Sequence, residues 1–276
     1  MPELPEVETV VRGLLPRLTG RQIVRAELRR ADLREKLPPQ LAKRLTGRRV
    51  QTVRRRAKYI LIDLDRDEVL LLHLGMTGRL VLSNGAAAPP GPHDHLDLIL
   101  DDGAVVRFSD PRRFGLVDLV AAKNLGEDPR LRTLGPEPLS PDFEAATLEA
   151  VLAGRRTAIK TALLDQRLVA GIGNIYACEA LFRARLSPLR PAGTVKGARA
   201  ERLVRAIREV LSEAIAAGGS SARDYVQASG ELGWFQHHWA VYDREHQPCP
   251  GCSCAGSVKR IVQGGRSTFY CPSRQR

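Results

Sequence analysis

The chain has 276 residues, is 43% hydrophobic, and carries 43 basic against 31 acidic residues, a formal net charge of +12. This apolar content excludes a disordered chain, and no apolar run approaches the ~20 residues of a membrane-spanning helix. The opening MPELPEVETV is acidic and lacks the apolar stretch of a signal peptide, so we expect a soluble, cytoplasmic protein. The basic excess suits a polyanion, because Lys and Arg side chains on phosphates release counterions, although a well-solvated basic surface would look the same.

The first element we expect is a helix over residues 4–15. Its apolar side chains recur at the spacing of one helix face: Leu4, Val7, Val10, Val11 and Leu14. Pro5 suits the first helical turn, and Glu6 suits the positive end of the helix dipole. Pro2 and Glu3 are therefore expected just ahead of the helix and held by it.

From residue 22 to about residue 120 the apolar side chains alternate, as in VQTVRRRAKYILIDLD and EVLLLHLGMTGRLVL. The segment HLDLILDDGAVVRFSD places Asp-Asp-Gly between two alternating runs, which is a hairpin signal. Several such strands joined by short turns predict an antiparallel β-sandwich. Residues 84–92 form a surface loop by composition.

A Pro/Gly-rich stretch at residues 134–143 predicts a linker, and helical patterns follow it at residues 145–153, 157–168, 174–184 and 198–217. The tail from residue 240 has the pattern of short strands around cysteines. We therefore expect an α+β multidomain chain of three parts: a β-sandwich with its N-terminal helix (residues 1–133), a helical domain (134–239) and a small cysteine module (240–276).

The extreme N-terminus offers a possible nucleophile. Met1 ahead of Pro is a residue that is commonly trimmed, and its removal would leave Pro2 as a free secondary amine. Such an amine can attack a sugar C1′ and form an iminium, and Glu3 beside it could move protons at the sugar. The alternative is that PELPE simply opens a helix.

Two glycine-flanked segments could approach a nucleic acid. In GIGN, residues 171–174, the glycines permit a tight turn and Asn174 would cap the next helix, whose free N–H groups can hold a phosphate; a plain helix–turn–helix joint is the alternative. In DPRRFG, residues 110–115, an Arg beside a Phe can insert next to bases. Met76, in HLGMTGRL, lies in another loop, although a lone Met is more often a core residue.

Two further groups of residues are candidates. Arg54, Arg56 and Lys58 alternate along one predicted strand, so they should share a face, which could equally be a solvated one. Four of the five cysteines fall between Cys249 and Cys271, and CxxC followed by Cys about twenty residues later indicates a zinc ribbon or β-hairpin finger. The fifth, Cys178, has the surroundings of a core residue.

Taken together and in this order, these segments resemble the bacterial formamidopyrimidine-DNA glycosylase family over the whole length of the chain. The residues that carry the resemblance are MPELPEVET, RRAKY, HLGMTGRL, HDHLDL, DPRRFG, LGPEPLS, TAIK, GIGNIYACEALF and GRSTFYCP. In that family an antiparallel β-sandwich is joined to a helix–two-turn–helix domain with a C-terminal zinc finger. The resemblance implies a bifunctional glycosylase and abasic-site lyase of base excision repair, which removes 8-oxoguanine and formamidopyrimidines and then nicks the strand by β,δ-elimination.

The resemblance also assigns roles to single residues. Pro2 would form the Schiff base, Glu3 would donate the proton at the sugar, and Glu6 would support that site. Lys58 would act in β-elimination and Arg266 in δ-elimination. The residues matched to the wedge that fills the space of the flipped nucleotide are Met76, Arg112 and Phe114. Those matched to other DNA contacts are His93, Arg155 (where some relatives have Lys), Lys160 and Asn174, and residues 219–238 match the loop that closes over the extruded base.

One position departs from the family pattern. Cys249, Cys252 and Cys271 would supply three ligands to a structural zinc ion, but Arg274 stands at the fourth ligand position and cannot coordinate a metal. Cys254 or water could complete the site, or the hairpin could hold by packing alone.

Two other interpretations of the sequence compete with membership of the formamidopyrimidine-DNA glycosylase family. The endonuclease VIII branch, which prefers oxidised pyrimidines, typically opens PEGPE, and Leu4 argues against it. A non-catalytic DNA-binding protein with a zinc ribbon would have no need of Pro2, Glu3 and Lys58 together. We expect a monomer that binds double-stranded DNA carrying oxidised bases or abasic sites.

Overall fold

The structure is a computed structural model that describes residues 1–276 except 86, 222–224 and 254–256. The chain forms two compact units. Unit 1 comprises Met1–Arg132 with Ala217–Gln236, and unit 2 comprises Thr133–Ala216 with His237–Arg276. The division into three domains at residues 133 and 239 stays a prediction.

Unit 1 begins with helix α1 (Leu4–Leu18), which confirms the helix expected from the N-terminal pattern. Glu3 is the residue just before the helix, in an extended conformation, and Leu4 and Pro5 occupy the first turn. The apolar face of α1 is buried, and the helix packs against strands β2 and β3.

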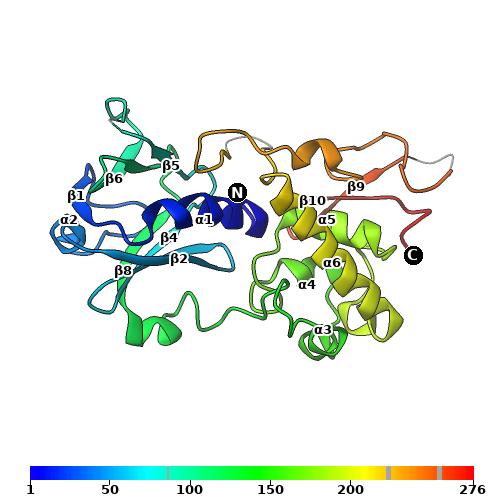
Figure 1. The fold of residues 1–276 in the computed structure, drawn as a ribbon. Coiled ribbons are helices and arrows are strands. Elements are labelled where there is room, and N and C mark those ends of the chain that lie inside the picture. The colour runs from blue at the N-terminus through cyan, green and yellow to red at the C-terminus, as the bar shows by residue number, and fades with distance from the viewer. Residues whose placement is uncertain (86, 222–224, 254–256) are drawn as a thin grey trace. The chain divides into compact units, whose positions relative to one another are not determined.

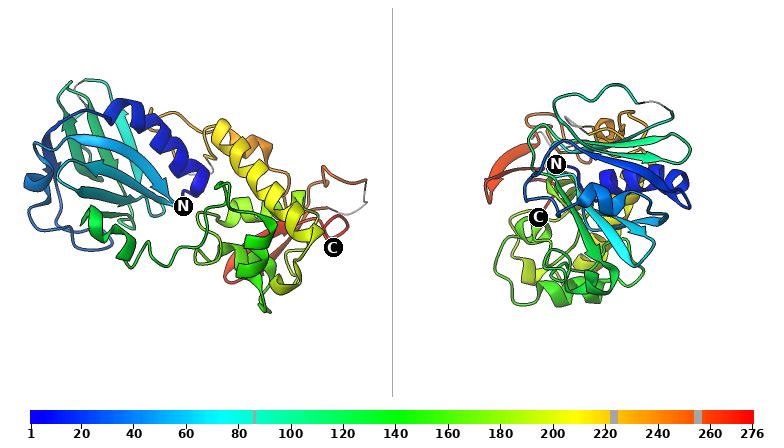
Figure 2. Two further views of the ribbon diagram at one scale, coloured as in Figure 1. Left: turned by 60° about the horizontal axis from the view of Figure 1, so that its bottom comes forward. Right: turned by 90° about the vertical axis from the view of Figure 1, so that its left-hand side faces the viewer.

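Two antiparallel four-stranded sheets follow α1 in unit 1 (Figure 1; Figure 2 shows the strands from two further sides). One has the order β1-β6-β7-β5, formed by Ile23–Leu28, Asp94–Leu100, Val105–Ser109 and Arg79–Ser83. The other has the order β2-β3-β4-β8, formed by Val50–Arg56, Tyr59–Leu64, Glu68–His73 and Leu116–Ala121. The predicted hairpin at Asp-Asp-Gly is confirmed, since β6 ends at Leu100 and pairs with β7.

One hydrophobic core serves α1 and both sheets, as the predicted sandwich requires. It includes Leu14 of α1, Ile62 of β3 and Leu98 of β6, each at most 1% exposed. Tyr225 and Ala228 belong to the same core, so the segment Ala217–Gln236 is part of unit 1 although the sequence places it after the helical region. A short helix α2 (Leu41–Leu45) and a 3-10 helix η1 (Ala122–Glu127) complete the unit, and neither was expected.

Unit 2 is helical, as predicted, with helices α3 (Ala145–Leu152), α4 (Ile159–Leu164), α5 (Asn174–Arg183) and α6 (Ala198–Ala216), and a 3-10 turn η2 (Ala192–Thr194). Helix α6, yellow in Figure 1, packs against α5 and α3. Another 3-10 turn, η3 (Phe235–His238), falls where the chain passes from unit 1 to unit 2.

The tail of unit 2 is a hairpin of β9 (Lys259–Gln263) and β10 (Arg266–Tyr270). It shares a small core with α5, formed by Cys178, Phe182, Val258, Phe269 and Cys271, which confirms Cys178 as a core residue. Glu179 of α5 is fully buried and its carboxylate accepts the backbone N–H groups of Ala240, Val241 and Tyr242 at 2.9 Å each. This carboxylate therefore fastens the start of the tail to α5.

Candidate active site

The residues proposed for chemistry at the N-terminus are buried and held in place by one carboxylate. Pro2 is buried, and Glu3 is 4% exposed. The backbone N–H of Glu3 donates to Oε2 of Glu6 at 2.8 Å, while Oε1 of Glu6 accepts the N–H of Ser220, also at 2.8 Å. Glu6, itself 2% exposed, thus ties the start of the chain to a residue 214 positions away.

Gly219 makes that approach possible. Its φ is +83°, and a Cβ there would lie 3.1 Å from Cγ of Glu6. A side chain at residue 219 would therefore meet both backbone strain and the Glu6 side chain. Residues 222–224 of the expected closing loop lie outside the described residues.

Lys58 is not on a strand face, and that prediction is wrong. Strand β2 ends at Arg56, the chain reverses through Ala57 at φ +52°, and β3 starts at Tyr59. Lys58 lies in this turn and is only 5% exposed, so it is no part of a solvated face.

His73, at the end of β4, is a neighbour of Lys58 that the sequence analysis did not single out. The pKa of His73 is lowered to about 4, mainly by burial, and the charges of Lys58 and Arg34 act in the same direction. Nδ1 of His73 accepts the backbone N–H of Gly75 at 2.9 Å, and the ring lies 4.9 Å from that of Tyr59. A neutral ring fits both observations, because an Nδ1 that accepts a hydrogen bond carries no proton.

The three expected wedge residues lie on two loops of unit 1 that touch. Met76 and Phe114 are 41% and 45% exposed, so both apolar side chains are accessible at the surface. The guanidinium of Arg112 lies over the ring of Phe114, 4.6 Å from its centroid. A Cβ on Gly75 would stand 2.4 Å from the carbonyl carbon of Phe114, so the two loop backbones are in direct contact.

His93 is exposed and directly precedes strand β6. Its backbone carbonyl accepts the N–H of Asp110, at the root of the Phe114 loop. The structure therefore places Pro2, Glu3 and Glu6 at the held N-terminus, and Met76, His93, Arg112 and Phe114 at the pair of loops.

In unit 2, two of the residues expected to contact DNA lie at one backbone carbonyl. The side-chain amide of Asn174 donates to the backbone oxygen of Ser267 at 2.9 Å, and Nζ of Lys160 lies 3.5 Å from the same oxygen. Ser267 follows Arg266 on β10. Lys160 is 0% exposed, so in this structure it supports the hairpin, and a direct phosphate contact stays a prediction.

The expectation that Asn174 caps α5 is wrong. Gly173 is the cap residue and Asn174 is the first residue of the helix. The side chain of Asn174 is used instead on the Ser267 carbonyl, across 93 residues of sequence.

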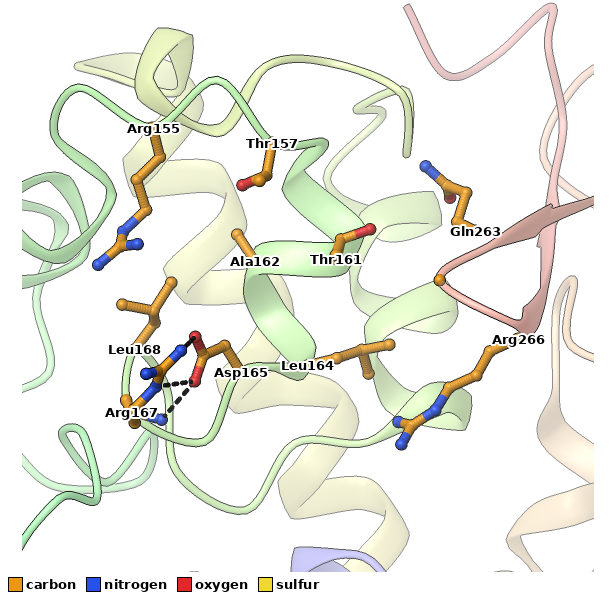
Figure 3. Close-up of a pocket in the computed structure, with 11 residues that line it drawn as sticks. Arg155, Thr157, Thr161, Ala162, Leu164, Asp165, Arg167, Leu168, Gln263 and Arg266 are labelled. Atoms are coloured by element: carbon orange, nitrogen blue, oxygen red, sulfur yellow. Dashed lines mark hydrogen bonds and ion pairs between the residues drawn. The ribbon is translucent and has the colours of Figure 1, made fainter.

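Arg155 and Arg266 line one groove of unit 2 (Figure 3). The hydroxyl-bearing Thr157 and Thr161 lie between them, and Arg167 lies beside Arg155. Arg167 is held by the carboxylate of Asp165 through contacts of 2.9 and 2.8 Å, whereas Arg155 donates to the carbonyl of Val151. Exposed guanidinium groups and hydroxyls in one groove suit the oxygens of a phosphate backbone.

Three cysteines of the tail could hold a metal ion. The sulfur atoms of Cys249, Cys252 and Cys271 lie within 4.8 Å of one another, and the Cys252 and Cys271 sulfurs are 3.6 Å apart. Tetrahedral zinc with Zn–S bonds of about 2.3 Å would separate two sulfurs by about 3.8 Å, so this spacing fits.

Arg274 has a different role from a ligand. Its guanidinium donates to the carbonyl of Gly251 and lies over the ring of Phe182, 4.9 Å from the centroid. Arg274 therefore ties the Cys249–Cys252 turn to α5. Cys254, the candidate for the fourth ligand, lies outside the described residues.

The β-sandwich holds its N-terminal residues on a buried carboxylate, and the helical unit carries a basic groove and a cysteine hairpin. These features are the ones expected of a DNA-processing enzyme. Comparison with known proteins identifies the family. Residues 1–117 match the sequence profile of the formamidopyrimidine-DNA glycosylase N-terminal domain, and residues 134–226 match that of the formamidopyrimidine-DNA glycosylase H2TH domain.

Curated relatives and solved structures agree with these matches. The chain is 58% identical to the formamidopyrimidine-DNA glycosylase of Cereibacter sphaeroides and 57% identical to that of Rhodospirillum centenum, over 100% of each chain. Its structure is similar to that of MutM (Fpg) from Thermus thermophilus, with a TM-score of 0.87 and 44% identity over 99% of this chain and 98% of the other. It is also similar to Lactococcus lactis Fpg in a complex with DNA containing N7-benzyl-Fapy-dG, with a TM-score of 0.89 and 33% identity over 100% of both chains.

This chain belongs to the formamidopyrimidine-DNA glycosylase family, and it is a DNA-binding repair enzyme. The family and fold inferred from the sequence are thereby confirmed. Among the described residues, no helix has the length and apolar character that crossing a membrane requires.

Proposed function

We propose that this enzyme excises formamidopyrimidines and 8-oxoguanine from DNA and then cleaves the strand at the resulting abasic site. A complex of a Lactococcus lactis Fpg mutant with Fapy-dG DNA and a complex of Lactococcus lactis Fpg with abasic-site DNA support both halves of this activity. Because bacterial DNA lies in the cytoplasm, the proposed activity places the enzyme there.

The nucleophile in this proposal is the nitrogen of Pro2 after Met1 has been removed. The amine forms a bond to C1′ of the damaged nucleotide, the bond from C1′ to the base breaks, and the departing base takes up a proton. Glu3 donates a proton at the sugar as its ring opens. Lys58 serves β-elimination of the 3′ phosphate, and Arg266 serves the δ-elimination that follows.

The observation that supports this proposal is that the Glu6 carboxylate holds the N-terminus in place by hydrogen bonds. Chain ends normally fray, and a frayed amine would lack the fixed geometry that a displacement requires. Here Pro2 and Glu3 are buried and the Glu3 backbone is hydrogen-bonded to a buried carboxylate.

DNA is held by two sets of side chains in this proposal. Met76, Arg112 and Phe114 enter the duplex and fill the space of the flipped nucleotide, which offsets part of the cost of unstacking. Arg155 and Arg266, exposed in the groove of unit 2, contact phosphates, and His93 adds a contact from unit 1. Lys160 and Asn174 hold the hairpin at Ser267.

We further propose that the tail binds one structural zinc ion through Cys249, Cys252 and Cys271. The sulfur spacing supports this, and a fourth ligand must come from Cys254 or water because a guanidinium offers no lone pair. Zinc would supply no chemistry to the reaction. It would hold the hairpin that presents Arg266.

Borohydride trapping on defined duplexes tests the substrate range. A duplex with 8-oxoguanine and one with a formamidopyrimidine should each give a covalent enzyme–DNA adduct, and an undamaged duplex should give none. A duplex with dihydrouracil is the control for the pyrimidine-specific branch. Trapping that is stronger on dihydrouracil than on 8-oxoguanine would contradict the proposed purine preference.

A further inference from the structure

Asp110 is a fully buried carboxylate at the root of the loop that carries Arg112 and Phe114. It is 0% exposed and directly follows strand β7. Its Oδ1 accepts the hydroxyl of Thr77 at 2.5 Å, and its Oδ2 accepts the backbone N–H of Gly115 at 2.7 Å. Burial of a carboxylate is unfavourable unless its oxygens are hydrogen-bonded, so these two partners define its position.

The two partners belong to different loops. Thr77 lies in the loop between β4 and β5, directly after Met76, whereas Gly115 directly follows Phe114 in the loop between β7 and β8. Thr77 extends the link, because its Oγ1 also accepts the backbone N–H of Arg112 at 3.2 Å. One carboxylate therefore binds the residues that follow Met76 and Phe114, and through Thr77 it is linked to the backbone of Arg112.

The backbone of Asp110 is fixed as well. Its N–H donates to the carbonyl of His93 at 2.9 Å, and its carbonyl lies 2.8 Å from Nε2 of the buried His95. The contact of Gly75 with Phe114 leaves no room for a side chain between the loops, since a Cβ would be 2.4 Å from backbone. The loops consequently have little freedom to move apart while Asp110 keeps its partners.

We propose that Asp110 is a positioning residue that joins the Met76 loop to the Arg112–Phe114 loop, so that the three wedge side chains enter the duplex as one preformed body. This inference rests on the proposed wedge role of those side chains. Asp110 does not touch DNA in this account. It acts by removing the need to order two loops at the moment of insertion, when the lost conformational freedom would slow entry.

The test uses Thr77 rather than Asp110, because Asp110→Ala leaves a buried N–H of Gly115 without an acceptor and can unfold the unit. Thr77→Val removes the hydroxyl at nearly constant volume, and Thr77→Ser keeps the hydroxyl as the matched control. Each is combined with Phe114→Ala. The readout is the stopped-flow rate of insertion, followed by a 2-aminopurine base next to 8-oxoguanine, alongside the melting temperature and the affinity for a duplex with a tetrahydrofuran abasic analogue.

Thr77→Val should slow insertion at least ten-fold, which is close to the lower limit of the effect of losing a hydrogen bond to a charged group, while Thr77→Ser stays near the wild-type rate. In the Phe114→Ala background Thr77→Val should slow insertion less than it does in the wild type, because one of the three side chains that the link positions is already missing. Insertion at the wild-type rate in Thr77→Val, or an equal loss in both backgrounds, would overturn the inference and leave Asp110 a stabilising residue. If Phe114→Ala itself inserts at the wild-type rate, the wedge proposal fails, and that result is separate from failure of the Thr77 comparison.

Discussion

Replacing Glu6 by Gln should weaken the hydrogen bonds that hold the N-terminus and remove most of the glycosylase and lyase activity. Both oxygens of Glu6 accept backbone N–H groups at 2.8 Å inside the protein, from Glu3 and from Ser220. A hydrogen bond to a charged group contributes about 1.5–3 kcal/mol, and the amide of Gln can satisfy only one of the two donors. We therefore expect a loss of about 2 kcal/mol in the free energy of unfolding, or a fall of roughly 4–8 °C in melting temperature.

The activity loss should exceed the stability loss. At a temperature where the Glu6→Gln protein is fully folded, the yield of borohydride-trapped adduct per minute should still fall at least ten-fold, because Pro2 and Glu3 are no longer fixed. Glu201→Gln is the matched control, an exposed glutamate in the first turn of α6, and its effect on stability should stay within about 0.5 kcal/mol. Equal behaviour of the two variants in both assays would refute the role we give to Glu6.

Three further predictions concern pH, salt and metal. The folded chain keeps His73 neutral down to a pKa of about 4, whereas the unfolded chain takes up that proton near pH 6.5. The free energy of unfolding should therefore fall as the pH falls from 6.5 to 4, by at most about 1.4 kcal/mol per pH unit. His73→Asn should flatten this slope in urea titrations, and an unchanged slope would argue against a neutral buried His73. Arg155→Gln and Arg266→Gln should each lower the salt slope of DNA binding by roughly one, and lost activity with an intact slope would point to chemistry instead of phosphate contact. Protein purified without chelators should contain close to one zinc per chain, and Arg274→Cys should tighten zinc binding in competition with a chelator; well under one zinc per chain in the unaltered protein would refute the metal site.

Local features of the sequence predicted local features of the fold well. The apolar spacing after Leu4 gave the true start of α1, and Asp-Asp-Gly marked the β6–β7 hairpin, because turn chemistry and helix periodicity depend on neighbouring residues. Lys58 was misplaced for a related reason. The alternation of Arg54, Arg56 and Lys58 continued the strand pattern, while the chain actually reverses at Ala57, a residue with no preference for positive φ.

Long-range contacts explain what the sequence could not show. The bond between Glu6 and Ser220 spans 214 residues, and no spacing rule connects them. The same holds for Asn174, whose side chain could have capped its own helix but instead bonds to Ser267. Asp110 stood within the DPRRFG motif, yet its importance appears only when the Met76 loop lies beside it.

The central claim is that the nitrogen of Pro2 is the nucleophile, and its most direct test is the site of covalent attachment. An adduct with 8-oxoguanine DNA, reduced with borohydride and digested, should show by mass spectrometry a residual sugar on the N-terminal peptide at Pro2, and a chain that keeps Met1 or carries an N-terminal acetyl group should give no adduct. Attachment at Lys58 or another lysine, or full adduct yield from the blocked chain, would contradict the account.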